Sequence, residues 1–191
     1  MMYKKLLLTA TFIAPLFANA ASIDKDGNEV FSIRYSEATT SGDTRPMFGV
    51  GFSHIRGAGE LGFTISADFQ NFDEDGNYID GAGQEKQEFQ FYNIMGGLTY
   101  GVTDEFYVMP KVGFSYSKIK DFSAEEKCSP ITGCSGKPNY INSTLDEDYR
   151  ISYGIDFMLV HDSLAYGIGV TDVSYFGERE TMLNLNLGYK F

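Results

Sequence analysis

Apolar and polar residues alternate along most of this chain, and the alternation is clearest at its end. Large apolar side chains occupy Leu183, Leu185, Leu187, Tyr189 and Phe191, and small or polar residues separate them. A period of two residues is typical of a β-strand with one apolar face. Reading back from the end, we identify eight such segments, at residues 29–37, 47–55, 60–72, 88–102, 106–119, 148–160, 164–176 and 181–191.

The connections between these segments alternate in length. Residues 56–59, 103–105 and 161–163 form short connections, whereas residues 38–46, 73–87 and 120–147 form long ones and residues 177–180 a modest one. Barrels of the bacterial outer membrane have tight periplasmic turns and larger outer loops. The sequence therefore predicts an all-β fold, an eight-stranded antiparallel up-and-down transmembrane β-barrel.

The two faces of the predicted strands differ in a way that orients the barrel. One face is apolar throughout, as in Ile151, Tyr153 and Ile155, and the other is small and neutral, as in Gly49 and Gly51. A water-facing exterior would carry long charged side chains, whereas the lumen of a narrow barrel requires small ones. We therefore place the apolar face against lipid, where a closed barrel avoids unpaired backbone groups.

A few charged residues interrupt the polar face, and they carry both signs. In a low-dielectric interior such charges must pair. We predict a network centred on Arg34 and Lys111 with Asp68 and Asp156, in a lumen that also receives Glu60 and Lys190. The network is either the filled core of a narrow barrel or the lining of a narrow channel.

Three residues fit the alternation poorly. Pro110 falls within a strand, where its missing N–H predicts a bulge or a local irregularity. Phe91 and Met95 point toward the lumen, and the alternation weakens after Thr171. A bulge in the fourth or the seventh strand would account for both observations.

Aromatic girdles are expected at the two ends of the strands, where the lipid-facing surface meets the membrane interfaces. The expected members are Tyr35, Phe69, Tyr92, Tyr116 and Tyr153 at the outer end, and Tyr100, Phe106, Tyr166, Tyr189 and Phe191 at the inner end.

The first residues are typical of a secreted chain. Lys4 and Lys5, an apolar run and Ala18-Asn19-Ala20 predict a signal peptide over residues 1–20 and a barrel domain over 21–191. Loss of the two lysines changes the formal net charge from −11 to −13, which disfavours binding to nucleic acid. In the oxidising compartment that the signal peptide implies, Cys128 and Cys134 are expected to form a disulfide within one loop.

Together these features resemble the OmpA/OmpX-type family of small eight-stranded outer-membrane barrels. The terminal Gly188-Tyr189-Lys190-Phe191 is similar to the family's assembly signal, carried by Tyr189 and Phe191. The resemblance implies insertion by the barrel assembly machinery, contact with outer-membrane lipid and lipopolysaccharide, and loop-borne roles such as adhesion. The sequence contains no cofactor motif, so we expect no cofactor, and we expect a monomer in the outer membrane of a Gram-negative bacterium.

Two short motifs offer other chemistry. His161-Asp162-Ser163 is similar to the His-x-Ser pair of lipid A deacylases, although polar turns use the same residues. Residues 24–29 and 73–77 match the first half of a calcium loop but lack its glycine at the sixth position and its carboxylate at the twelfth. We expect no catalytic or metal site. The favoured function is contact with envelope, host or phage through the outer loops; a narrow porin-like channel and a lipid A hydrolase are the alternatives.

Overall fold

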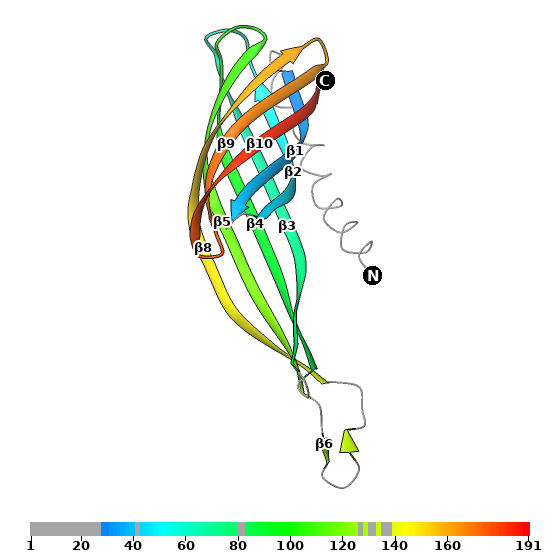
Figure 1. Ribbon diagram of the computed structural model, residues 1–191. Helices are drawn as coiled ribbons and strands as arrows, with labels where there is room; N and C mark the ends of the chain where they lie inside the picture. The colour runs from blue at the N-terminus through cyan, green and yellow to red at the C-terminus, as the bar shows by residue number, and fades with distance from the viewer. Residues whose placement is uncertain (1–27, 41–42, 80–82, 126–127, 130–132, 135–138) are drawn as a thin grey trace.

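Eight long antiparallel strands close into a barrel, as the alternation predicts (Figure 1). The structure is a computed structural model that describes residues 28–40, 43–79, 83–125, 128–129, 133–134 and 139–191. The barrel strands are β1 (Asn28–Thr40), β2 (Asp43–Ile55), β3 (Leu61–Ile79), β4 (Gly83–Gly101), β5 (Phe106–Glu125), β8 (Asn139–His161), β9 (Leu164–Tyr175) and β10 (Glu178–Lys190), and a separate ribbon contains β6 (Cys128–Ser129) and β7 (Gly133–Cys134).

The barrel closes between its first and last strands. β1 pairs with β2 and with β10, so that Arg34 lies opposite both Gly49 and Asn186. The last residue takes part, because the Phe191 amide donates to the Glu29 carbonyl at 3.0 Å. The predicted signal peptide lies outside the described residues. Among the residues that are described, no helix is long and apolar enough to cross a bilayer.

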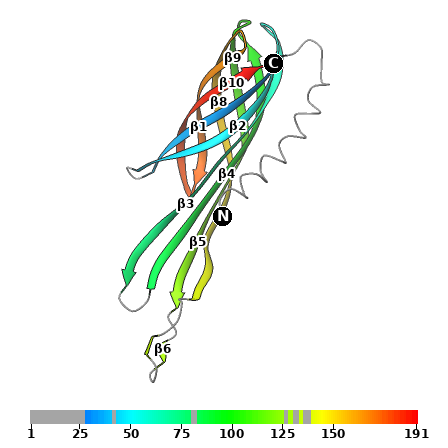
Figure 2. The same cartoon turned by 90° about the vertical axis from the view of Figure 1, so that its right-hand side faces the viewer.

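Four strands are longer than the sequence predicts. β3, β4, β5 and β8 have 19, 19, 20 and 23 residues, against 12 or 13 in the other four barrel strands. Residues 73–87 and 120–147, expected as loops, are therefore mostly strand. Their apolar alternation fades because neither face needs to be apolar once a strand has left the bilayer. We call residues 70–79, 83–91, 117–125 and 139–148 the four-stranded extension (Figure 2).

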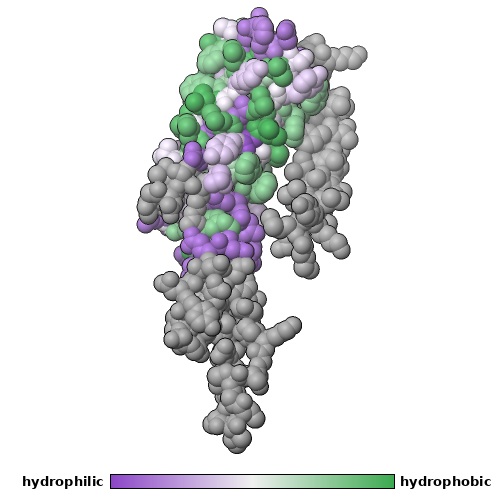
Figure 3. Space-filling view, turned by 45° about the vertical axis from the view of Figure 1, so that its right-hand side comes forward, coloured by the Kyte–Doolittle hydropathy of each residue, from purple (hydrophilic) through white to green (hydrophobic). Residues whose placement is uncertain are grey.

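The exterior of the barrel carries an apolar belt, as expected. Phe114 is 68% exposed and Ile151 is 55% exposed, and polar residues lie above and below the belt (Figure 3). A soluble protein does not expose so large an apolar surface. At the outer end, the rings of Tyr92, Tyr116 and Tyr149 form a row across three strands, with centroids 6.2 and 4.5 Å apart. Belt and aromatic row have the form of a lipid-facing surface.

The β4–β5 ladder is irregular at Pro110, as expected, but the bulge expected in the fourth or the seventh strand is wrong. β5 and β8 keep one register through the pair Pro110–Ile155, and β4 and β5 keep theirs from Gly97–Lys111 to Tyr100–Val108, with a gap in the ladder between. Phe91 and Met95 lie inside the barrel without any register shift. The shifts that occur are in the four-stranded extension, between residues 75 and 78 of β3 and between residues 119 and 120 of β5.

Candidate functional site

Four charged side chains meet in the middle of the barrel. The Arg34 guanidinium donates from Nε to Asp68 Oδ1 at 2.9 Å and from Nη1 to Asp156 Oδ2 at 2.7 Å. Lys111 Nζ donates to the same Asp156 oxygen at 2.5 Å, and Asn93 supports Asp68 at 3.2 Å. All four charged residues are at most 5% exposed. The structure thus brings together the predicted pairing partners from β1, β3, β5 and β8, and we call them the ionic cluster.

The ionic cluster balances two cations against two carboxylates. Removing a charge from water costs several kcal/mol unless it is paired and hydrogen-bonded. Here each carboxylate receives a hydrogen bond from Arg34, so the guanidinium links Asp68 on β3 to Asp156 on β8 across the lumen. The cluster therefore works as a cross-brace of the barrel.

Glu60 and Lys190, which the alternation assigned to the same lumen, lie elsewhere. Glu60 is exposed in the connection before β3, where its amide donates to the Gly57 carbonyl at 3.1 Å. Lys190 is half-buried at the end of β10, and its amide donates to the Ser163 carbonyl at 2.8 Å. Both lie at the short-turn end of the barrel, because Glu60 precedes the first residue of β3 and Lys190 is the last residue of β10.

Glycines make the space that the ionic cluster occupies. Gly49 lies opposite Asp68, and Gly169 lies opposite Asp156. A Cβ atom on Gly169 would lie 2.0 Å from Asp156 Oδ1, and one on Gly49 would lie 2.3 Å from Asp68 Oδ1. Gly97 has the same relation to Lys111, with its Cβ position 2.8 Å from the lysine Cγ. Each of these three charged side chains therefore lies opposite a glycine on at least one neighbouring strand, which leaves space for it in the narrow lumen.

An apolar layer fills the lumen at the short-turn end. Its buried members come from five strands and include three residues of β5 and β8 that carry long side chains. Tyr107 also fastens the turn below it, since its hydroxyl donates to the Asp104 carbonyl at 2.8 Å. The layer consists of Val30, Ile55, Tyr107, Met109, Met158, Val160 and Ala165. It separates the ionic cluster from this end of the barrel.

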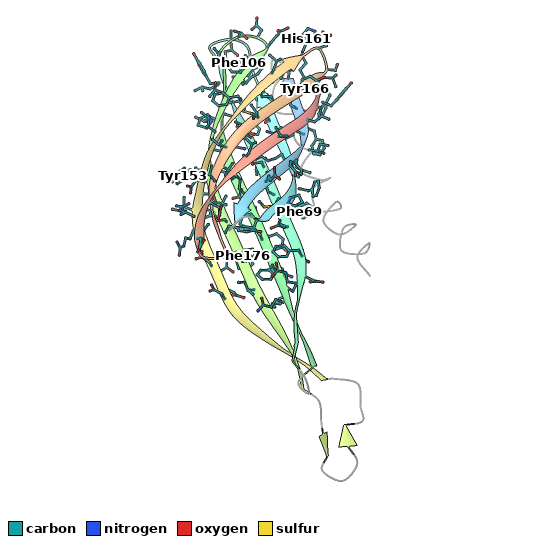
Figure 4. All side chains as sticks on the ribbon, in the orientation of Figure 1. Phe69, Phe106, Tyr153, His161, Tyr166 and Phe176 are labelled. Atoms are coloured by element: carbon teal, nitrogen blue, oxygen red, sulfur yellow. The ribbon has the colours of Figure 1, made fainter. Side chains whose placement is uncertain are left out.

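A second apolar layer fills the outer mouth, and the β9–β10 turn belongs to it. Met47, Phe91, Val173, Tyr175 and Met182 are buried there, and Phe176 packs against them (Figure 4). The Phe176 ring lies 5.3 Å from the Phe89 ring and 6.2 Å from the Phe72 ring, on the inner face of the four-stranded extension. The turn therefore folds over the mouth of the barrel.

The backbone at this turn has an uncommon conformation. Phe176 has a φ of 48° and Gly177 a φ of 89°. Glycine adopts such angles readily, but a phenylalanine is rarely found there. Tyr175 anchors the turn from inside, because its hydroxyl donates to Gln70 Oε1 at 2.5 Å and Gln70 Nε2 donates to the Pro46 carbonyl at 2.9 Å. Ring packing and this hydrogen-bond chain hold the strained residue in place.

The sequence analysis did not predict either apolar layer. Large side chains such as Met47, Tyr107 and Met158 also occupy inward-facing positions of the alternation, but the small polar residues are more numerous on that face and dominated its interpretation. Phe91 and Met95 gave the clearest signal and were interpreted as evidence for a bulge. An ion crossing the barrel would have to pass an apolar layer, the ionic cluster and another apolar layer.

The other candidate residues lie at the two ends. His161, at the short-turn end (Figure 4), has its Nδ1 atom 3.2 Å from Glu105 Oε1 and its Nε2 atom 3.8 Å from Asp162 Oδ2. Cys128 and Cys134 are paired opposite each other in the β6–β7 ribbon, but their side chains are not described, so the disulfide stays a prediction. Tyr189 and Phe191 are exposed at the end of β10.

Nothing in the described residues forms a metal centre. No group of three or more His, Cys, Asp or Glu residues in that part of the chain is arranged to hold an ion. Of the first partial match to a calcium loop, residues 24–27 lie outside the described residues. In the second partial match, at residues 73–77, the side chains of residues 73 and 74 are described and those of residues 75–77 lie outside the described part of the chain.

Solved structures share this architecture. No family model and no curated protein matches the sequence. The attachment invasion locus protein Ail of Yersinia pestis, crystallised with the heparin analogue sucrose octasulfate, has a TM-score of 0.63 and 14% identity over 87% of this chain and 99% of its own. The outer membrane protein OprG of Pseudomonas aeruginosa has a TM-score of 0.50 and 12% identity over 88% and 97%. The fold is that of small eight-stranded outer-membrane barrels.

Proposed function

We propose that this protein is a non-conducting outer-membrane barrel that binds a surface partner through its four-stranded extension. The extension itself carries the proposal. Closing a barrel does not require β3, β4, β5 and β8 to be six to eleven residues longer than the other barrel strands, as their lengths of 19 to 23 residues against 12 or 13 show. A rigid sheet held above the membrane suits recognition of another molecule.

The edge of the extension suits an extended partner. β8 pairs with β5 from Asn139 onward, whereas its pairing with β9 begins only at Tyr153–Asp172. Residues 139–150 of β8 thus lie at an edge of the sheet, and edge strands can add a strand from another chain. Main-chain hydrogen bonds would supply the affinity, and side chains such as Tyr149 and Arg150 would supply the selectivity.

Charge favours a basic or neutral partner. Residues 73–87 and 120–147 together contain ten carboxylates and four lysines, and the whole chain has a formal net charge of −11. Ail is known with a sulfated heparin analogue, but an acidic surface repels such polyanions. We therefore propose a partner with a basic surface, such as a host or phage protein, in addition to the lipid that surrounds the barrel.

Cell binding tests this proposal. Cells that express the full chain should adhere to immobilised host matrix proteins, and raised ionic strength should weaken the adhesion because exposed charges are screened. In two shortened variants, an Asn-Gly turn joins Asp73 to Glu88 or Lys118 to Glu147, which are cross-strand partners. Both should keep the heat-modifiable mobility of a folded barrel and lose adhesion. Equal adhesion by the shortened variants contradicts the proposal.

Two further measurements address the alternatives. The two apolar layers support a closed lumen, so the purified protein should give no unitary conductance steps in a planar bilayer. His161 contacts carboxylates of Glu105 and Asp162, which supports a structural role in the turn rather than activation of Ser163. Lipid A from cells that express the wild type or Ser163→Ala should therefore show the same acylation.

A further inference from the structure

The tip of the β9–β10 hairpin is not part of the barrel wall. The ladder between β1 and β10 ends at the pair Ala38–Met182, and the ladder between β8 and β9 ends at Tyr153–Asp172. Beyond these pairs β9 and β10 stay hydrogen-bonded to each other up to their turn. Among the described strands, residues 173–180 therefore pair only with one another, and we call them the lid.

Hydrogen bonds hold the lid inside the mouth of the barrel. Ser174 N donates to Ser115 Oγ at 3.1 Å, and Ser174 Oγ donates to Asp148 Oδ2 at 2.6 Å. Next along the chain, the Tyr175 hydroxyl donates to Gln70 Oε1. The end of β9 therefore crosses the inner face of β8 toward β5, instead of continuing along the edge of β8.

The backbone of β8 offers the groups that a longer β9 would use. In an antiparallel ladder, every second residue directs both its N–H and its C=O to the same neighbouring strand. On β8 these are the odd-numbered residues, because the Ile155 carbonyl oxygen lies 2.7 Å from the Cβ position of Gly169 on β9. By the same alternation, Ile151 and Tyr149 direct their N–H and C=O groups to the side that β9 leaves.

A side chain takes the place of β9 at the first of these residues. Arg179 Nη1 donates to the Ile151 carbonyl at 2.9 Å and to Asp172 Oδ1 at 2.6 Å. The guanidinium also lies over the Tyr153 ring, 5.3 Å from its centroid. If the register of the ladder continued, Ser174 would lie opposite Ile151, and its N–H would donate to the same carbonyl. A backbone donor of the lid can therefore replace the arginine exactly at this carbonyl.

We infer that the lid has two positions, docked in the mouth as in the structure and released along β8. In the released position Ser174 pairs with Ile151 and Phe176 pairs with Tyr149, so that ladder hydrogen bonds replace the contacts of the docked lid. The Phe176 side chain then faces lipid, as the other even-numbered side chains of β9 do. It extends the aromatic row of β4, β5 and β8 onto β9.

The lid has the structure of a unit that moves as one body. Phe176 and Gly177 form a two-residue turn with positive φ at both positions. This is the turn type that matches the twist of a hairpin, so the lid keeps its own pairing in either position. We expect bending where the outer ladders end, at Asp172 on β9 and at its partner Thr181 on β10.

Release changes the outer mouth and leaves the rest of the lumen as it is. It withdraws Val173 and Tyr175 from the apolar layer that they share with Met47 and Phe91. The ionic cluster and the apolar layer at the short-turn end stay in place, so the lumen stays closed. The released lid also covers the edge of β8 at residues 149 and 151. Both positions follow from the strand geometry, and neither requires a partner at that edge.

A disulfide can trap the released position. In a background with Cys128→Ser and Cys134→Ser, the pair Tyr149→Cys/Phe176→Cys places two thiols opposite each other on the released ladder. Their Cα atoms would be about 5.5 Å apart, which suits a disulfide. In the docked position the two residues lie on opposite faces of the sheet, since Tyr149 is 70% exposed on the outside and Phe176 packs inside the mouth. Oxidation of the protein in phospholipid bilayers should link them, which a maleimide-polyethylene glycol assay for free thiols detects.

Tyr149→Cys/Tyr175→Cys is the matched control. Residue 175 is one position out of register with residue 149 and faces the lumen in the released position, so this pair should link at least about tenfold more slowly. If the first pair did not link, the lid would have the docked position alone. If both pairs linked at the same rate, the hairpin would open without a defined second position. Either result overturns the inference.

Modification of a buried thiol tests the lid with the Phe176 ring intact. Met47→Cys, in the same serine background, lies beneath the docked lid and reports its release through reaction with a water-soluble methanethiosulfonate. Tyr175→Phe removes only the hydroxyl that donates to Gln70, so it should speed the reaction by about three- to tenfold. Tyr107→Phe is the matched control, because it removes a hydroxyl that donates to the Asp104 carbonyl at the other end of the barrel. Equal rates with and without Tyr175→Phe, or an equal rise with Tyr107→Phe, contradict a lid.

Discussion

Four of the eight strands of the barrel body continue into the four-stranded extension, but the two regions arrange their side chains in opposite ways. In the body the outward face is apolar and the inward face holds the ionic cluster. One step beyond the row of Tyr92, Tyr116 and Tyr149, the outward face carries the ion pair of Lys118 and Glu147. There the inward face becomes aromatic, with stacked Phe rings from β3 and β4. The polarity of each face is therefore determined by its surroundings, which are lipid, lumen or water, and it changes along one and the same strand.

Ion pairs show most clearly how the two regions differ. Lys111 and Asp156 are almost completely buried, whereas Lys118 and Glu147 are exposed to solvent on the extension. A buried pair leaves an uncompensated charge when one partner is removed, and an exposed pair leaves a hydrated one. The same two residue types should therefore respond to mutation very differently in the two regions.

Asp156→Ala should have the largest effect. It leaves Arg34 and Lys111 with Asp68 as their only carboxylate in the ionic cluster, so we expect a loss of about 3–5 kcal/mol in the free energy of unfolding. Urea titration of the folded protein in detergent micelles, followed by tyrosine fluorescence and gel mobility, measures it.

Glu60→Gln is the control for this change, because Glu60 is an exposed carboxylate in a turn of the same barrel. Its effect should stay within about 0.5 kcal/mol. If Asp156→Ala were as mild as the control, the ionic cluster would not brace the barrel, and the contrast between body and extension would disappear.

A pair of glycine variants gives an intermediate effect. Gly169→Ala would place its Cβ 2.0 Å from Asp156 Oδ1 and 2.7 Å from the Ile155 carbonyl, so both the carboxylate and a backbone would have to move. We expect a loss of about 1–3 kcal/mol in the free energy of unfolding, as for other overpacked interiors.

Gly96→Ala tests the same exchange on the lipid-facing side of β4. Nothing lies within 4 Å of its Cβ position. Alanine restricts the unfolded chain more than glycine does, so this variant should be neutral or more stable by up to about 1 kcal/mol. Equal losses at residues 96 and 169 would show that backbone conformation, rather than space for the ionic cluster, selects these glycines.

The sequence allowed the body to be predicted because lipid imposes a strict rule on one face. Alternation such as Ile151 to Leu159 survives only where every second residue must be apolar, and the four pairing charges stood out against a glycine-rich lumen. The extension has no such rule. Charged and apolar residues such as Lys118 and Ile119 can both occur on a strand that lies in water, so the sequence there has no distinctive period and was predicted as a loop.

The lumen was only half predictable for a related reason. The charged residues of the lumen can be paired from the sequence by their opposite signs and their similar heights in the barrel. Inside the lumen, however, no surrounding medium requires apolar or polar side chains at a given height, as lipid does on the outer face. Met109 and Met158 meet Val30 and Ala165 across the barrel because of the register and the curvature, which a single sequence does not reveal. Phe176 depends on a turn conformation that the residue itself disfavours.

The smallest expected effect is the pH dependence of the stability that the exposed ion pair of Lys118 and Glu147 contributes. The hydrogen bond from Lys118 holds the pKa of Glu147 below its ordinary value of 4.5, and the same bond raises the pKa of Lys118 above 10.5. The carboxylate therefore stabilises the fold above its ordinary range and loses this contribution as pH falls through the lowered pKa. The ammonium stabilises the fold below its ordinary range and loses this contribution as pH rises through the raised pKa. The stability difference between wild type and Glu147→Gln should be flat between those limits, shrink at both ends and fade with added salt. A difference that persisted in acid would mean that Glu147 acts through packing and not through charge.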